Sequence, residues 1–289
     1  MQANSPHTAF VLAGGGSLGA VEVGMLRALV EHGVQADLIV GSSVGAINSV
    51  FFAADPTIQG VRRLENIWRG LRRKDVFPMG LTGLFRWLAG GQGHVFSPVG
   101  LERLLLDHLP VAVLEQTAIP VCVIATDVLR GTEVRLRSGP ALPALMASTA
   151  IPGLFPPVRI GGRLMVDGAV SNHTPISVAI SLGATRVVVL PAGYPCARPD
   201  APRGGFAMAL HALNVMTAQQ LARDVERYRG QAQITVIPPL CPLMMPAYDF
   251  AGCEEIIDRA GTATAEWLGM GGLDAVGAEN LLVPHHHEM

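Results

Sequence analysis

The first sixty residues combine short apolar runs with helical periodicity, separated by glycine-rich turns. Thr8–Ala13 is apolar and β-prone, and from Leu18 to Leu29 apolar residues recur at the three- to four-residue spacing of one helix face. The same order repeats with an apolar strand at Leu38–Val40 and a buried helix at Ala46–Ala54. Consecutive strand–helix units of this kind predict a parallel sheet that helices cover.

The rest of the chain continues the alternation of strands and helices, and no linker separates two domains. Further strands are expected at Val121–Thr126, Arg186–Leu190 and Ile234–Ile237, and helices at Pro175–Leu182, Ala207–Tyr228 and Glu254–Leu268. The pattern predicts an α/β fold of three layers, α/β/α, around a largely parallel central sheet, in a single domain over residues 1–289. Within it, residues 71–98 are interpreted as an inserted cap and residues 284–289 as a disordered tail.

Composition narrows the classes of function. With 49% hydrophobic and 15% charged residues, the chain of 289 residues is too apolar to be disordered. Its formal net charge of −2 attracts no phosphate polymer, so no nucleic-acid partner is expected. No signal peptide or membrane span is evident, which favours a cytoplasmic location. The four cysteines lack metal-ligand spacing and indicate neither a disulfide framework nor a zinc site.

The glycine-rich segment after the first strand allows two interpretations. Gly14–Gly19 satisfies Gly-x-Gly-x-x-Gly, the fingerprint of a dinucleotide site. That site also needs an acidic residue at the end of the second strand, whereas the only nearby acid, Asp37, stands at its start. Backbone amides at a helix N-terminus can equally stabilise a developing oxyanion. The sequence therefore favours an oxyanion loop, and no cofactor is expected.

A candidate nucleophile follows the second strand. Gly41-x-Ser43-x-Gly45 places a serine on a sharp turn between a strand and a helix. The flanking glycines permit a strained backbone, and the hydroxyl is exposed at the helix N-terminus. A turn of this composition also occurs without catalysis, so the motif needs partners elsewhere in the chain.

Two later segments supply those partners, namely residues 147–157, with the sequence ASTAIPGLFPP, and Asp167-Gly168-Ala169. Together with the glycine loop and the serine turn, they resemble the patatin-like phospholipase family in its bacterial form, over residues 8 to 190. The resemblance implies a catalytic dyad of Ser43 and Asp167. It also implies oxyanion donors at Gly14, Gly15 and Gly16, and supporting glycines at Gly19, Gly41, Gly45 and Gly168.

The activity implied is that of a serine acyl hydrolase acting on carboxylic esters of phospholipids, lysophospholipids or neutral lipids, without a metal. Asp167 would serve as the base, which requires burial to raise its pKa, and its apolar lead-in Leu164–Val166 is consistent with burial. Leu18 stands where the family often has Arg or Lys, so this position provides no charge assistance. That departure argues against a strong preference for phospholipids.

Several alternatives remain at this point. His173, six residues after Asp167, could complete a triad, although a lone histidine is more often structural. The same site could perform acyl transfer or thioester hydrolysis, or the scaffold could bind lipid without catalysis. Residues 71–88, with Arg72, Arg73 and Lys74, form either a buried cap or a peripheral membrane contact. Asp127 is interpreted as a residue that ties a loop.

Overall fold

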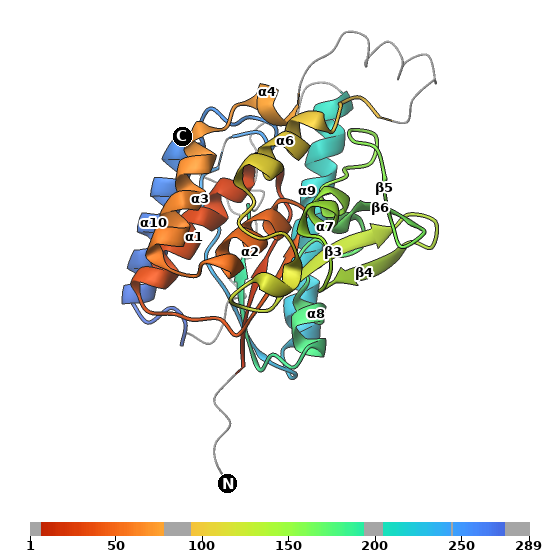
Figure 1. The fold of residues 1–289 in the computed structure, drawn as a ribbon. Coiled ribbons are helices and arrows are strands. Elements are labelled where there is room, and N and C mark those ends of the chain that lie inside the picture. The colour runs from red at the N-terminus through yellow and green to blue at the C-terminus, as the bar shows by residue number, and fades with distance from the viewer. Residues whose placement is uncertain (1–6, 78–93, 194–204, 244, 275–289) are drawn as a thin grey trace.

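The computed structural model describes residues 7–77, 94–193, 205–243 and 245–274, with helices on both faces of one sheet (Figure 1). In chain order the elements are β1 (Thr8–Leu12), η1 (Gly16–Leu18), α1 (Gly19–Glu31), β2 (Leu38–Ser42), α2 (Val44–Ala54), α3 (Ile58–Gly70), α4 (Arg73–Val76), α6 (Val99–His108), η2 (Leu114–Gln116), β3 (Val121–Asp127), β4 (Thr132–Leu136), α7 (Ala141–Ser148), β5 (Val158–Ile160), β6 (Arg163–Asp167), η3 (Gly168–Val170), α8 (Ile176–Ser181), β7 (Arg186–Leu190), α9 (Gly205–Tyr228), β8 (Gln233–Val236) and α10 (Cys253–Gly269). The predicted α/β fold class is confirmed.

The sheet combines a parallel region with an antiparallel edge. Within the described residues its strand order is β5-β6-β3-β2-β1-β7-β8, and β4 also pairs with β3. The strands β3, β2, β1, β7 and β8 are joined by parallel pairs. In contrast, β4 and β6 each pair with β3 in the antiparallel sense, and β5 pairs with β6 in the same way. The antiparallel edge is what brings β6 next to the end of β2.

The central strands are buried on both faces, which explains their continuous apolar sequences. Along β1, Phe10 and Leu12 face a core shared with α1, α2, α3 and α10. Ala9 and Val11 face the opposite core, which contains residues of α8 and α9. Figure 1 shows these two groups of helices on opposite sides of the strands. The chain is therefore layered α/β/α.

Most predicted elements lie where the sequence places them, and β7 has the predicted bounds Arg186–Leu190. In the segment interpreted as a cap, Val76 and Phe77 are buried in the main core. Residues 78–93 of the cap and the tail 284–289 lie outside the described residues. The expected loop function of Asp127 is supported, since its Oδ1 accepts hydrogen bonds from the amides of Leu129 and Arg130, both at 3.1 Å.

The cysteines depart from the sequence-based expectation at one position. Cys241 is disulfide-bonded, so the expectation of no disulfide is wrong there. Spacing along the chain reveals only local cysteine pairs, whereas a disulfide depends on which loops meet in three dimensions. Cys122 and Cys253 are free, and burial raises the pKa of both thiols to about 12.

None of the helices within the described ranges has the length and apolar character needed to cross a membrane.

Candidate active site

Ser43 lies on the turn between β2, which ends at Ser42, and α2, which begins at Val44. Its backbone angles are φ 55° and ψ −127°, and among the described residues other than glycine it alone has a positive φ. Such a conformation costs on the order of 1–3 kcal/mol and persists only when the surrounding structure enforces it. The strained turn places the Ser43 hydroxyl beyond the carboxyl end of the sheet, at the N-terminus of a helix.

The glycines on either side of Ser43 are required by close backbone approach. A Cβ atom on Gly45 would lie 2.6 Å from the Leu12 carbonyl oxygen on β1. A Cβ atom on Gly41 would collide with the Ser49 hydroxyl and with the Gly45 carbonyl oxygen. These contacts let the start of α2 pack directly against the strands, which holds the turn in place.

Asp167 reaches Ser43 because two strands end beside the same part of β3. Ser42, the last residue of β2, pairs with Ile124, and Asp167, the last residue of β6, pairs with the next residue, Ala125. The two strands run toward each other along β3, so their ends meet. The Ser43 hydroxyl donates a hydrogen bond of 2.7 Å to Asp167 Oδ2.

The Asp167 carboxyl group is almost completely buried, with 2% of the residue exposed. Its Oδ1 accepts a hydrogen bond of 2.8 Å from the Ala169 amide. Burial disfavours the charged form and raises the pKa of Asp167 to about 7, and the hydrogen bonds from Ser43 and Ala169 oppose this rise. A carboxyl group with such a pKa can accept a proton near neutral pH.

Two hydroxyl residues that the sequence analysis did not single out hold the pair in place. Ser148 Oγ accepts the Ser43 amide at 3.0 Å and donates to the Ile124 carbonyl at 2.6 Å. Thr126 Oγ1 donates to the Asp167 carbonyl at 2.8 Å. Ser148 could have been found from the sequence, because it belongs to the segment that carried the family resemblance. Nothing in the sequence distinguished Thr126 except its position on the predicted strand that became β3.

The glycine loop lies between β1 and α1, close to Ser43. The Gly14 amide donates to the His173 carbonyl at 3.1 Å, so it is already engaged. The amides of Gly15 and Gly16 donate to no acceptor within the described part of the chain. Gly16 has φ +59° and lines the same cavity as Ser43, while a Cβ atom on Gly19 would lie 2.6 Å from the Val44 side chain.

Gly168 follows Asp167 at the point where β6 meets the end of β2. A Cβ atom on Gly168 would collide with the Ile124 carbonyl oxygen and would lie 2.7 Å from Ser42 Oγ. The absence of a side chain therefore lets the residue after Asp167 pass against β3. In this way Gly168 allows the close approach of the two strand ends.

His173 lies near the loop and is partly buried, but its ring makes no hydrogen bond to Ser43 or Asp167 within the described residues. Its Nδ1 lies 3.2 Å from Thr174 Oγ1, and its ring lies 3.3 Å from the position of a Cβ atom on Gly14. Burial lowers the pKa of His173 to about 4, so the ring is neutral at pH 7. These contacts are those of a side chain that packs against the glycine loop.

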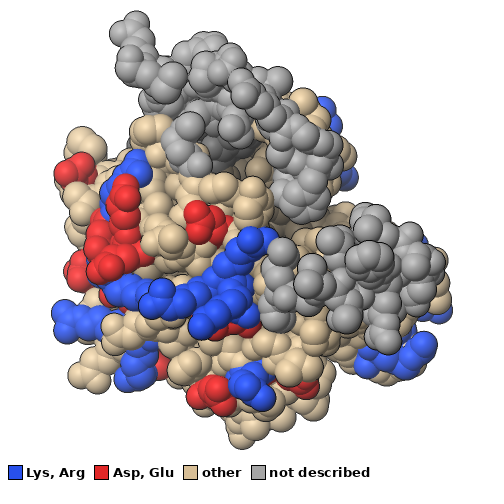
Figure 2. Space-filling view, turned by 90° about the horizontal axis from the view of Figure 1, so that it is seen from above, with Lys and Arg blue, Asp and Glu red and all other residues tan. Residues whose placement is uncertain are grey.

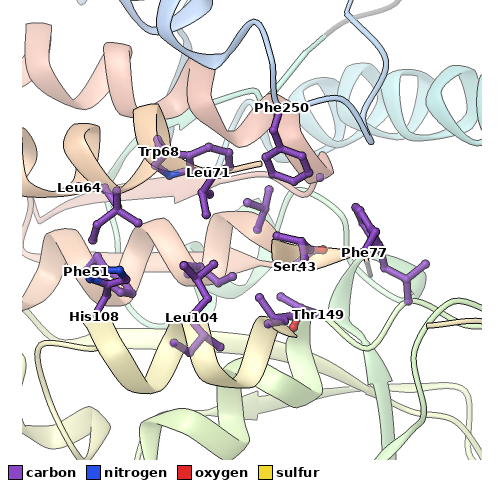
Figure 3. Close-up of a pocket in the computed structure, with 18 of the residues that line it drawn as sticks. Ser43, Phe51, Leu64, Trp68, Leu71, Phe77, Leu104, His108, Thr149 and Phe250 are labelled. Carbon is purple, nitrogen blue, oxygen red and sulfur yellow. The ribbon is translucent and has the colours of Figure 1, made fainter. Parts of the chain in front are cut away.

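An apolar cavity opens beside the Ser43 hydroxyl (Figure 3). The centres of water-sized molecules can occupy about 80 Å³ of it. Side chains of α2, α3 and α6 line it, together with Thr149 and aromatic residues from four separate segments: Trp68, Phe77, Phe155 and Phe250. Phe77 stacks on Phe155 with ring centroids 5.6 Å apart. The described residues contain no group of three or more His, Cys, Asp or Glu side chains that could hold a metal ion.

Comparison with known proteins identifies the family. Residues 10–180 match the family model described as patatin-like phospholipase. The chain belongs to the patatin-like phospholipase family. In this patatin-like chain, the match includes the glycine loop, Ser43 and Asp167, whereas Phe250 and the elements β7, β8, α9 and α10 lie beyond it.

Relatives of this patatin-like chain are considerably longer. Patatin-like phospholipase domain-containing protein 7 of Rattus norvegicus is 31% identical over 188 residues, which are 64% of this chain and 13% of the rat protein. An uncharacterized NTE family protein of Mycobacterium tuberculosis is 28% identical over 242 residues, 83% of this chain and 38% of that protein. The chain therefore spans less than half the length of either relative.

Among solved structures, the human GIVD cytosolic phospholipase A2 in complex with methyl gamma-linolenyl fluorophosphonate inhibitor and terbium chloride is similar with a TM-score of 0.50. The sequences are 14% identical, and the match covers 96% of this chain and 60% of the human chain. At this identity the likeness concerns the fold.

Proposed function

We propose that the protein is a serine acyl hydrolase that cleaves carboxylic esters of lipids. The observation that carries the proposal is the 2.7 Å hydrogen bond from Ser43 Oγ to Asp167 Oδ2 beside an apolar cavity. A nucleophile bonded to a buried base is the arrangement that acyl transfer through a covalent intermediate needs. Family membership is consistent with this chemistry.

In the proposed reaction Ser43 Oγ attacks the ester carbonyl carbon and its proton passes to Asp167 Oδ2. The carbonyl electron pair moves onto oxygen, where the amides of Gly15 and Gly16 stabilise the negative charge. Collapse of this intermediate expels the alcohol, which takes the proton from Asp167, and leaves an acyl group on Ser43. Water then attacks the acyl group, with the same proton transfers, and releases the fatty acid.

The decisive experiment measures fatty acid release from p-nitrophenyl esters, lysophospholipids and diacylphospholipids. Ser43→Ala and Asp167→Asn should each remove nearly all turnover, on the order of a 10⁴-fold loss, because the two residues act as one unit. For the same reason the double variant should be no worse than either single variant. Ester hydrolysis that survives Ser43→Ala in a folded protein would refute the proposal.

We also propose a peripheral membrane contact near this site. Arg72, Arg73 and Lys74 are exposed, whereas Leu71, Val76 and Phe77 of the same segment line the cavity. The face seen from above in Figure 2, where α4 lies, carries a band of Lys and Arg side chains next to acidic ones. Basic residues beside the cavity could hold the protein on an anionic lipid surface.

A further inference from the structure

The cavity beside Ser43 follows one face of α2. Val44, Ile47 and Phe51 line it, and these residues are spaced three and four apart, as one face of a helix requires. Because α2 begins directly after Ser43, this face leads from the Ser43 hydroxyl to the other end of the cavity. Figure 3 shows Ser43 near one end, whereas Phe51 lies at the other.

Two further helices complete the wall. On α6, Leu101, Leu104, Leu105 and His108 line the cavity, and on α3, Leu64, Ile67 and Trp68 do so, with Leu71 directly after the helix. In Figure 3, Leu64 and His108 lie beside Phe51 at the end away from Ser43, so each helix contributes one residue to that end. His108 is exposed to solvent, so a ligand that extends beyond Phe51 meets an imidazole and water.

The polar groups between the two ends are already engaged. The Trp68 indole donates to Asn48 Oδ1 at 2.9 Å, and the Thr149 hydroxyl donates to the Leu145 carbonyl at 2.8 Å. The wall between Ser43 and the Phe51 end therefore offers a ligand little beyond apolar surface. An alkyl chain gains from such a wall, whereas a polar ligand would lose its hydrogen bonds with water.

The length and width of the cavity suit one short alkyl chain. The seven residue-to-residue steps from Val44 to Phe51 advance about 10 Å along the helix, which about eight extended methylene groups span. Spread over that length, the 80 Å³ open to the centres of water-sized molecules corresponds to a tube of about 1.6 Å radius. Adding the radius of such a molecule, about 1.4 Å, gives a free radius of about 3 Å, which admits one alkyl chain and excludes a second.

We infer that this cavity measures the acyl chain of the substrate, that it prefers chains of about eight to ten carbons, and that Phe51 sets the limit. The inference rests on the proposed function, because it places the ester carbonyl at Ser43. Longer chains would have to displace Phe51 or leave their terminal carbons in water.

The test compares kcat/KM for p-nitrophenyl esters with acyl chains of about 4 to 14 carbons. In the native protein kcat/KM should rise about threefold per carbon up to about eight carbons and then stop rising. Phe51→Ala should extend the rise by about three carbons, whereas Ile47→Trp, which fills the middle of the cavity, should end it earlier. Leu106→Ala, on an exposed side chain of α6, is the matched control and should leave the profile unchanged.

A second measurement does not need catalysis. In Ser43→Ala protein, binding of saturated fatty acids measured by calorimetry should strengthen up to about eight to ten carbons, and adding Phe51→Ala should move that limit to longer chains. A limit that is the same with and without Phe51→Ala, in either experiment, would overturn the inference. Loss of ester hydrolysis alone, with the binding limit still moved by Phe51→Ala, would instead refute the proposed hydrolase and retain the chain-measuring cavity.

Discussion

At the scale of single residues, the site depends on environments that change the ordinary properties of common side chains. Ser43 is held at φ 55°, which turns its hydroxyl toward Asp167. Burial raises the pKa of Asp167 to about 7, which gives this carboxylate the basicity that an exposed one lacks. His173 shows the opposite change, because burial lowers its pKa to about 4 and keeps its ring neutral.

The pKa of Asp167 predicts how activity depends on pH. Below about pH 7 the carboxyl group is protonated and cannot accept the proton of Ser43, so kcat/KM should fall about tenfold per pH unit on the acid side. Above this pH it should level off. The measurement is kcat/KM for a soluble ester across this range, in a protein whose folded state is checked at each pH. A flat profile from about pH 5 to 8 would contradict the role of Asp167 as a base with a raised pKa.

His173 allows a test of the dyad against a triad. His173→Ala should keep ester hydrolysis within about threefold of the native protein, because its ring is not bonded to Ser43 or Asp167 in the described structure. Removing a member of a catalytic triad would instead lower turnover on the order of 10⁴-fold. Steady-state hydrolysis of one ester by both proteins decides the matter, and a loss as deep as that of Ser43→Ala would require a triad.

At the scale of elements, a buried polar network joins α1, α2 and α3 behind the cavity wall. Asn48 Nδ2 donates to Glu22 Oε2 at 2.8 Å and to the Gly19 carbonyl at 2.9 Å, while Asn48 Oδ1 accepts from Trp68. Burial disfavours the charged form of the Glu22 carboxyl group and raises its pKa well above its ordinary value, and the hydrogen bond from Asn48 opposes this rise. Asn48 thus links the start of α1 to Trp68 of α3, which lines the cavity.

This network predicts a large effect on stability from one small change. Asn48→Ala should lower the free energy of unfolding by about 3 kcal/mol, because it leaves buried groups of Glu22 and Trp68 without a partner. Urea unfolding followed by circular dichroism measures the difference, with Asn214→Ala on the exposed surface of α9 as the control. Equal stability of the two variants would show that the network contributes little.

At the scale of the whole molecule, the α/β/α layers place Ser43, the glycine loop and the segment around α4 at one end. The glycine loop follows β1 and Ser43 follows β2, so both lie at the carboxyl ends of neighbouring parallel strands. The segment around α4 contributes apolar side chains to the cavity and basic side chains to the surface. This arrangement would allow a lipid to pass from a membrane surface to Ser43.

The membrane contact can be tested by removing its charge. Replacing Arg72, Arg73 and Lys74 by Gln should weaken binding to vesicles of anionic phosphatidylglycerol by up to about 100-fold, because each basic residue near such a surface contributes about 1 kcal/mol. Sedimentation with vesicles measures the change.

Replacing the three exposed arginines of the 223–229 region by Gln alters net charge equally and serves as the control: Arg223, Arg227 and Arg229. If the variant at residues 72–74 sediments like the native protein, the membrane contact is refuted.

The sequence by itself predicted the parallel strands β1, β2, β3, β7 and β8 and the helices α1, α2, α8, α9 and α10, but not α6, α7 or β4. Apolar periodicity and glycines at turns encode those elements, the glycine loop and the turn at Ser43 locally, whereas Asp167 was singled out through the resemblance to a family. Only the tertiary structure showed that Ser43 and Asp167 touch, because their contact depends on β2 and β6 ending beside neighbouring residues of β3.

Four further features are visible only in the tertiary structure: the hydrogen bond from the Ser43 amide to Ser148, the Glu22–Asn48–Trp68 network, the disulfide bond of Cys241 and the length of the cavity. Each of these joins segments far apart in the chain. Local periodicity fixes which face of an element is buried, whereas the partner of that face depends on the packing of the whole chain.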